Sequence, residues 1–173
     1  IKPLYLLNVF FFFFLIMAPW LIHCLIVITS FFGMEFIAWF THKYVMHGLL
    51  WSWHEDHHKP HQLKTGFWEK NDRFFLVFAI PSMICYILGT LYYHLYQWLL
   101  YIGIGISIYG VAYFLVHDVY IHRRFSWFKH IDNTYSKAIL RAHGAHHLKQ
   151  TKENCESFGM LLVNFKYLKR NRP

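Results

Sequence analysis

Ten of the fourteen histidines lie in four short strings with spacings typical of metal ligands. The strings are HKYVMH (His42, His47), HEDHH (His54, His57, His58), HDVYIH (His117, His122) and HGAHH (His143, His146, His147). On an α-helix, positions i, i+3 and i+4 share one face, so HEDHH and HGAHH can each direct three imidazoles at one point. Positions i and i+5 are about 140° apart. His42 and His47 therefore cannot stack on an α-helix, and they would flank a point ahead of the helix end or serve two different metals.

Ten imidazoles are too many for one metal ion. A structural zinc site takes four ligands, usually with cysteines among them, whereas ten imidazoles suit two ions with about five each and with open positions for a small molecule. Ligation by nitrogen alone suits iron, copper, zinc or nickel. A redox metal with open positions in a membrane protein favours O₂ activation. One such string could be a surface run of histidines, but four strings in matched order are not explained as core residues.

Other polar residues near the strings are candidates for a supporting role. Carboxylates that could accept hydrogen bonds from the ligand rings, and so fix their tautomers, are Glu35, Glu55, Asp56 and Asp118. The histidines outside the strings are expected to be interfacial or hydrogen-bonded rather than ligands, and they are His23, His61, His94 and His130.

The composition places the chain in a membrane. Of its 173 residues, 56% are hydrophobic and only 15% are charged, which is too apolar for a soluble domain of this size. The expected spans are 4–18, 21–41, 74–93 and 98–120, with a break at Pro19 between the first two. We therefore predict an all-α, multi-pass membrane protein with three or four transmembrane helices and a histidine-rich helical cap that holds a dimetal site. Residues 1–20 would be an extra apolar segment, and 21–173 the main domain.

The charge distribution predicts the topology. Sixteen of the seventeen Lys and Arg residues follow Phe40, in 43–73 and 123–172. The positive-inside rule places these segments and the histidine strings on the cytoplasmic side. The basic tail is explained by topology and by attraction to anionic lipid, with docking of an acidic electron carrier as a further role. No nucleic-acid-binding pattern is visible.

Several motifs together carry a family resemblance. HKYVMHG, WHEDHHKP, FWEKND, YGVAYFLVHDVYIHRR, RAHGAHH and CESFG resemble the bacterial-type β-carotene hydroxylases, within the fatty acid hydroxylase superfamily of membrane non-haem di-iron enzymes. The similarity covers about Cys24 to Met160. Two departures are the added segment 1–20 and the residues Asn154 and Glu156, which flank Cys155 where the family has a small and an apolar residue.

The resemblance implies a function and its cofactors. It implies hydroxylation of C3 of a carotenoid β-ring, from β-carotene through β-cryptoxanthin to zeaxanthin, with O₂, two iron ions and electrons from a ferredoxin-type donor. The family's metal ligands would be the ten histidines of the four strings. Aromatic residues near the same level could line a slot for a rigid polyene, and they are Phe36, Trp39, Tyr109 and Tyr113.

Rival functions remain open at this point. A fatty-acyl or sterol hydroxylase or desaturase would share the metal chemistry. A membrane cytochrome with bis-histidine haem would need paired histidines deep within facing spans, whereas the strings lie at the ends of spans. A metal transporter would place its polar residues along the spans through the bilayer.

Overall fold

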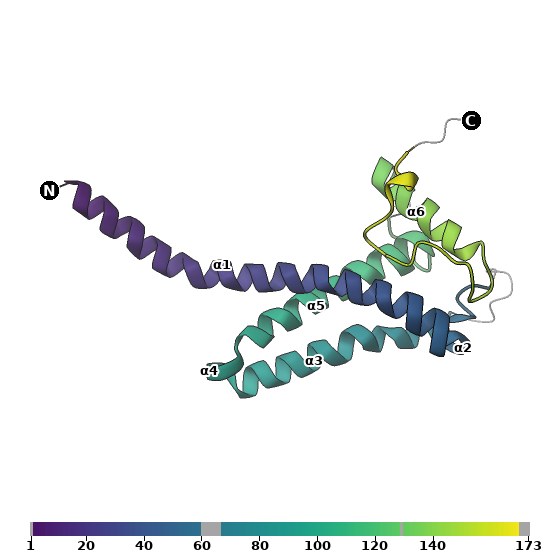
Figure 1. Cartoon of the computed structure of the whole chain (residues 1–173), viewed down its shortest axis with the longest axis horizontal. Coiled ribbons are helices and arrows are strands. Elements are labelled where there is room, and N and C mark those ends of the chain that lie inside the picture. Colours follow the sequence, from purple (N-terminus) through teal and green to yellow (C-terminus); the bar gives the residue numbers. More distant parts are fainter. Residues whose placement is uncertain (1, 60–66, 129, 170–173) are drawn as a thin grey trace.

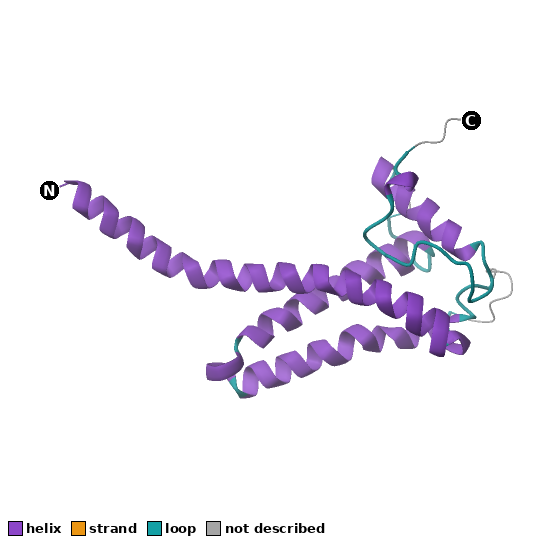
Figure 2. Ribbon diagram, in the orientation of Figure 1, coloured by secondary structure: helices purple, strands orange, loops and turns teal. Residues whose placement is uncertain are grey.

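The computed structural model describes residues 2–59, 67–128 and 130–169, and these form an all-helical protein with no strand among them. The elements are α1 (Lys2–Phe40), η1 (Thr41–Leu49), α2 (Trp51–His54), η3 (Lys70–Phe75), α3 (Leu76–Leu91), α4 (Tyr93–Tyr96), α5 (Trp98–Phe114), η4 (Leu115–Ile121), α6 (Thr134–His147) and η5 (Phe165–Tyr167). Figure 2 shows the long helices joined by a short turn at one end and by loops around α6 at the other. The expected all-α class is confirmed.

Three helical stretches are long and apolar enough to cross a membrane. They run through Ala18–Leu49, Lys70–Leu91 and Trp98–Ile121. Figure 1 shows that α1, α3 and α5 run alongside one another, with α6 and the C-terminal segment gathered at one end and α4 at the other. The three stretches agree with the expected spans at 21–41, 74–93 and 98–120, and the histidine strings follow or end them.

The expected break at Pro19 is wrong for the helix. α1 continues through Pro19 without interruption, and its N-terminal part projects beyond the other helices in Figure 1. Proline removes one backbone donor but is tolerated in transmembrane helices, where local adjustments satisfy the freed backbone groups. Whether residues 1–20 form a separate segment or span stays a prediction.

The bundle is held together by α5, which packs against both α1 and α3. Its buried core joins all three helices and consists of Met34, Ala38, Phe78, Ile106 and Tyr109. The Ser82 hydroxyl donates to the Gly103 carbonyl (3.1 Å) and also bonds the Ser107 hydroxyl (2.8 Å), which satisfies polar groups between α3 and α5. This packing fixes the helix ends from which the histidines project.

The closest approach between α1 and α5 depends on Gly105. A Cβ atom built there would lie 2.6 Å from both the Val27 carbonyl oxygen and Ser30 Cβ, whereas one at Gly110 would meet Phe78 at 3.5 Å, an ordinary contact. Only glycine therefore permits the observed contact at position 105, as is typical of small residues between membrane helices.

We expect Gly105→Ala to separate α1 from α5 and to destabilise the protein by about 1–3 kcal/mol, because the clash is with backbone. Thermal unfolding of the detergent-purified variant measures this. Gly110→Ala on the same helix is the control and should unfold at the wild-type temperature. Equal stability of the two variants would contradict this packing.

Candidate metal centre

The ten histidines of the four strings meet at the end of the bundle next to α6, where they form two groups. In the five-histidine group, each residue offers a nitrogen within 4.8 Å of the others, and its members are His42, His47, His54, His58 and His146. A second set meets the same criterion: His57, His122, His143 and His147. His117 joins it, since its Nε2 lies 3.0 Å from Nε2 of His57. These five residues are called the second group below.

The two H-x4-H strings reach the site because α1 and α5 end in π-helices, η1 and η4. In a π-helix the backbone bond runs from residue i+5 to residue i, and the His122 amide donates in this way to the His117 carbonyl (2.9 Å). The ring centroids of His42 and His47 are 5.2 Å apart, and those of His117 and His122 are 4.5 Å apart. Of the two alternatives left open for His42 and His47, the structure therefore favours one shared point over two different metals, because the π-helix brings positions i and i+5 onto one face.

The H-x2-HH strings divide between the groups. The i and i+4 members of each string stay together, as His54 with His58 and His143 with His147, while the i+3 member enters the opposite group. His57 and His146 are these exchanged residues. The expectation that each string directs three imidazoles at one point is wrong. The two groups lie side by side, and each H-x2-HH string contributes histidines to both.

Backbone carbonyls orient most of the five-histidine group. Four of its Nδ1 atoms donate to carbonyls of residues 149–158: His58 to Lys149 (3.0 Å), His47 to Lys152 (3.2 Å), His146 to Glu156 (2.9 Å) and His42 to Phe158 (3.0 Å). The fifth, His54, donates to the Asn71 side-chain oxygen (2.6 Å). Each of these rings therefore carries its proton on Nδ1 and turns the lone pair of Nε2 toward the centre of the group.

In the second group, carboxylates rather than carbonyls contact the Nδ1 atoms of two rings. His57 Nδ1 lies 2.8 Å from Glu69, and His117 Nδ1 lies 3.2 Å from Asp118. Arg124 binds both Asp118 and Asp72 at 2.7 Å, so it connects η4 to η3. A carboxylate partner fixes the tautomer of an imidazole and makes its other nitrogen a stronger metal ligand.

The facing Nε2 atoms are arranged as ligands of a cation would be. His47 and His146 place them 3.1 Å apart, and the same contact is 3.1 Å for His42 with His54 and 3.0 Å for His57 with His117. Because both Nδ1 atoms of each pair donate elsewhere, two lone pairs face each other and no hydrogen bond can join them. With a metal–nitrogen distance of about 2.1 Å, ligands at right angles lie about 3.0 Å apart and tetrahedral ones about 3.4 Å. These separations fit imidazole nitrogens that would share one metal ion in each group.

Burial keeps four histidines of the two groups neutral, as metal binding requires. It lowers the pKa of His54 to about 2 and that of His146 to about 3, with neighbouring histidines adding to the effect. Burial also lowers the pKa of His57 and His143 well below the usual value. All four rings are therefore uncharged at neutral pH and available as ligands.

The carboxylates predicted to support the ligands have different positions. Asp118 contacts a ligand ring, as described above. Glu55 pairs with Lys59 on the surface (3.2 Å), and Asp56 accepts from the Lys70 amide (2.6 Å). Glu35 is buried, and its recorded partners in the described chain are Tyr109 and the backbone of 160–162.

Sequence reasoning missed Glu69 and Asn71, which contact His57 and His54 directly. Both lie in the quoted motif FWEKND, where Glu69 and Asp72 form a helix-capping box at the start of η3. This capping pattern lies directly before a membrane span in a chain that also has histidine strings. That combination is the signal that could have identified Glu69 and Asn71. The four histidines outside the strings lie apart from both groups where described: His23 stacks on Tyr101, His94 is in α4 and His130 is exposed, while His61 falls outside the described residues.

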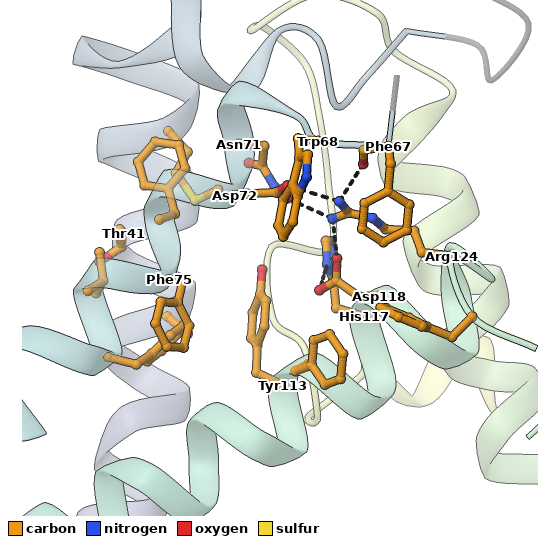
Figure 3. Close-up of a pocket in the computed structure, with 17 residues that line it drawn as sticks. Thr41, Phe67, Trp68, Asn71, Asp72, Phe75, Tyr113, His117, Asp118 and Arg124 are labelled. Carbon is orange, nitrogen blue, oxygen red and sulfur yellow. Dashed lines mark hydrogen bonds and ion pairs between the residues drawn. The ribbon is translucent and has the colours of Figure 1, made fainter. Parts of the chain in front are cut away.

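An apolar cavity of about 430 Å³ is lined by residues of all three candidate spans and reaches His117 of the second group. Figure 3 shows Tyr113 and His117 on one side, Phe75 and Thr41 opposite, and the Arg124–Asp72–Asp118 cluster at one end. Of the four aromatic residues predicted to contact substrate, Tyr113 lines this cavity, and its ring lies 5.0 Å from that of His117.

The other three aromatic residues lie elsewhere. Tyr109 is fully buried in the core and donates to Glu35, whereas Phe36 and Trp39 line a separate cavity of about 500 Å³. Phe158 also lines that cavity, and its ring packs 5.5 Å from that of His42. A contact between substrate and Phe36, Trp39 or Tyr109 stays a prediction.

A third cavity, of about 510 Å³, reaches the second group from the cap. Four of the group's histidines line it, and they are His57, His122, His143 and His147. Lys59 and Arg123 also line it, and both are exposed. One set of imidazoles is therefore approached from two sides, through an apolar cavity between the spans and through a basic one beside α6.

Comparison with known proteins identifies the family. Residues 27–167 match the family model described as fatty acid hydroxylase. Beta-carotene hydroxylases from Pseudescherichia vulneris and Pantoea ananas are 43% and 42% identical, over 82% of this chain and 77% and 78% of theirs. A chloroplastic beta-carotene 3-hydroxylase from Arabidopsis thaliana is 37% identical over 75% of this chain and 41% of that protein. No solved structure matches the chain. The chain belongs to the fatty acid hydroxylase family.

We expect His146→Ala to lower the metal content of the purified protein, because it removes a buried ring from the five-histidine group. Outer partners of metal ligands already change affinity by about 10–100-fold, and loss of a ligand should cost at least as much. His94→Ala, at the opposite end of the bundle, should keep the full metal content. Elemental analysis distinguishes these, and equal metal in both variants would contradict the assignment.

We expect the metal-free protein to lose stability as the pH falls below about 6.5, where histidines of the unfolded chain take up protons. His54 and His146 in the folded chain stay neutral until about pH 2 and 3, so the unfolded state binds more protons throughout this window. Each such histidine should cost about 1.4 kcal/mol per pH unit. Chemical unfolding at pH 7, 6 and 5 measures the loss.

His54→Gln removes one of these titrating groups and is the comparison for that slope. Its stability should fall less steeply with pH than that of the wild-type protein. A wild-type stability that stays constant from pH 7 to pH 5 would show that the cap histidines are not held neutral by burial.

Proposed function

We propose that this chain is a membrane di-iron monooxygenase that hydroxylates C3 of the β-rings of carotenoids, converting β-carotene through β-cryptoxanthin to zeaxanthin. The observation that carries the proposal is the pair of imidazole groups with facing lone pairs, one of which adjoins an apolar cavity between the spans. The names of the bacterial relatives, both beta-carotene hydroxylases, support the choice of substrate.

The ten histidines would hold two iron ions, five to each group. Iron suits all-nitrogen ligation with open positions and supplies the activation of O₂ needed to oxidise an unactivated carbon. The overall reaction consumes the substrate C–H bond, O₂, two electrons and two protons, and it yields the alcohol and water. The carboxylates Glu69 and Asp118 hold the rings of His57 and His117 in a fixed tautomer throughout.

The apolar cavity is the place for the substrate ring. Its lining is mostly aromatic and aliphatic, and it has room for one substituted ring and the start of a chain. The remainder of a long polyene would stay between the spans in lipid. This arrangement brings a ring carbon close to His117 and keeps water away from it.

Electrons would enter from the cap. Lys59 and Arg123 give the third cavity a basic edge beside four of the histidines, which suits an acidic donor of the ferredoxin type. The excess of Lys and Arg on this face supports a cytoplasmic orientation under the positive-inside rule, and the bacterial relatives support a bacterial cytoplasmic membrane.

Two rival functions are less well supported. A haem cytochrome needs two histidines on opposite faces of a porphyrin, whereas here four or five ring nitrogens lie within 4.8 Å of one another. A fatty-acyl hydroxylase or desaturase would share the metal centre, and the similarity to relatives named for carotene argues against it.

We expect cells that accumulate β-carotene to form its mono- and dihydroxylated products when they express this chain, as measured by pigment chromatography. Val77→Trp, which fills the apolar cavity, should lower conversion by about tenfold or more by misplacing the ring. Val111→Trp on the exposed face of α5 is the control and should convert as the wild type does.

Metal content should be the same in both tryptophan variants, so that any difference reflects the substrate. Unchanged β-carotene together with hydroxylated fatty acids would support the acyl rival instead. Equal conversion by Val77→Trp and Val111→Trp would place the substrate outside this cavity.

A further inference from the structure

One segment near the C-terminus orients most of the five-histidine group without contributing a ligand. This segment, residues 149–162, is called the strap. Its carbonyls accept from the Nδ1 atoms of four of the five rings, and the accepting residues are Lys149, Lys152, Glu156 and Phe158. The direction of four Nε2 lone pairs therefore depends on where the strap's backbone lies.

The strap contains no helix or strand that would hold those carbonyls in place. Asn154 and Ser157 adopt left-handed backbone conformations, with φ of 61° and 60°. Asparagine tolerates this conformation, which accounts for its place beside Cys155, but serine adopts it at a cost. Because no regular backbone ladder runs through the strap, its position must be fixed by contacts with other parts of the molecule.

Tyr135 of α6 donates to the Leu161 carbonyl, and Lys166 and Tyr167 bond the Glu156 side chain. The contact with the most hydrogen bonds is made by Glu35, a buried carboxylate of α1. Its Oε1 atom accepts from three successive backbone amides, those of Met160 (3.0 Å), Leu161 (2.9 Å) and Leu162 (2.8 Å). Its Oε2 atom accepts from the hydroxyl of Tyr109 on α5 (2.5 Å). A charged group within a span is costly unless it is paired, so four converging donors indicate a built anchor.

The strap passes close to this anchor at Gly159. A Cβ atom there would lie 2.8 Å from the Leu162 carbonyl oxygen and 3.3 Å from Glu35 Oε1. Even a methyl group would therefore push the backbone away from the carboxylate. The anchor can be disturbed from the side of the strap without changing any polar side chain.

We propose that Glu35 is a positioning residue for the five-histidine group and acts on the metal through the strap. The carboxylate fixes residues 160–162, and the strap in turn holds the carbonyls of Glu156 and Phe158 against His146 and His42. This inference rests on the proposed metal centre but not on the identity of the substrate.

The second group provides an internal reference. Its described Nδ1 partners are Glu69 at the start of η3 and Asp118 in η4, and neither belongs to the strap. Loss of the anchor should therefore weaken one metal ion and spare the other. A general loss of folding would weaken both.

The test compares Glu35→Ala, Glu35→Gln and Gly159→Ala in the full chain reconstituted with Fe²⁺ under exclusion of oxygen. Release of iron to an excess of chelator should show one of two phases accelerated about tenfold in Glu35→Ala and in Gly159→Ala. Glu35→Gln keeps one acceptor oxygen and should give a smaller effect. Amide hydrogen exchange across 156–162 should rise in the same order, with or without iron.

Ser82→Ala is the control, because it removes a buried hydrogen bond between α3 and α5 far from the strap. It should leave both release phases and the exchange of 156–162 unchanged. Equal acceleration of both phases, or unchanged exchange in Gly159→Ala, would overturn the proposal. If Glu35→Ala fails to insert, the other two variants decide the question. Absence of bound iron would refute the proposed function, whereas the exchange measurement would still test the anchor.

Discussion

The facing lone pairs of the ligand imidazoles are the constraint on which the rest of this structure depends. Nε2 atoms about 3 Å apart repel one another unless a cation lies between them, and each is unprotonated because its ring donates from Nδ1. Holding such an arrangement requires outer acceptors of fixed position. The strap, the capping segment at η3 and the carboxylates of Asp118 and Glu69 supply them.

The two ligand groups cannot be assigned to separate halves of the chain. His57 lies with His143 and His147, while His146 lies with His54 and His58. Each group therefore needs both halves of the chain to meet, and α6 becomes part of the centre only when its capped N-terminus and the strap position it against η1 and η4. Metal binding should accordingly be coupled to the assembly of the whole cap.

The two histidine groups lie at the ends of the spans. An apolar compound could therefore approach them from one side and a charged one from the other. A cavity between the spans reaches His117, and a basic cavity beside α6 reaches the same group from the other side. The outer partners also differ, since carbonyls and an amide serve the five-histidine group whereas carboxylates serve the second group. The imidazoles with carboxylate partners, His57 and His117, thus include the one that lines the apolar cavity.

The sequence by itself was enough to identify ten histidines as candidate metal ligands, three of the spans and the family. This was possible because the length of an apolar stretch and a repeated metal-ligand spacing are local properties. It did not determine how the histidines divide between the two groups. Positions i and i+5 share a face only in a π-helix, and tertiary packing makes the choice between an α-helix and a π-helix. It also could not identify the strap, because any residue offers a backbone carbonyl. The sequence predicts Glu35 as an acceptor for a ligand ring, whereas the fold places it against the backbone of 160–162.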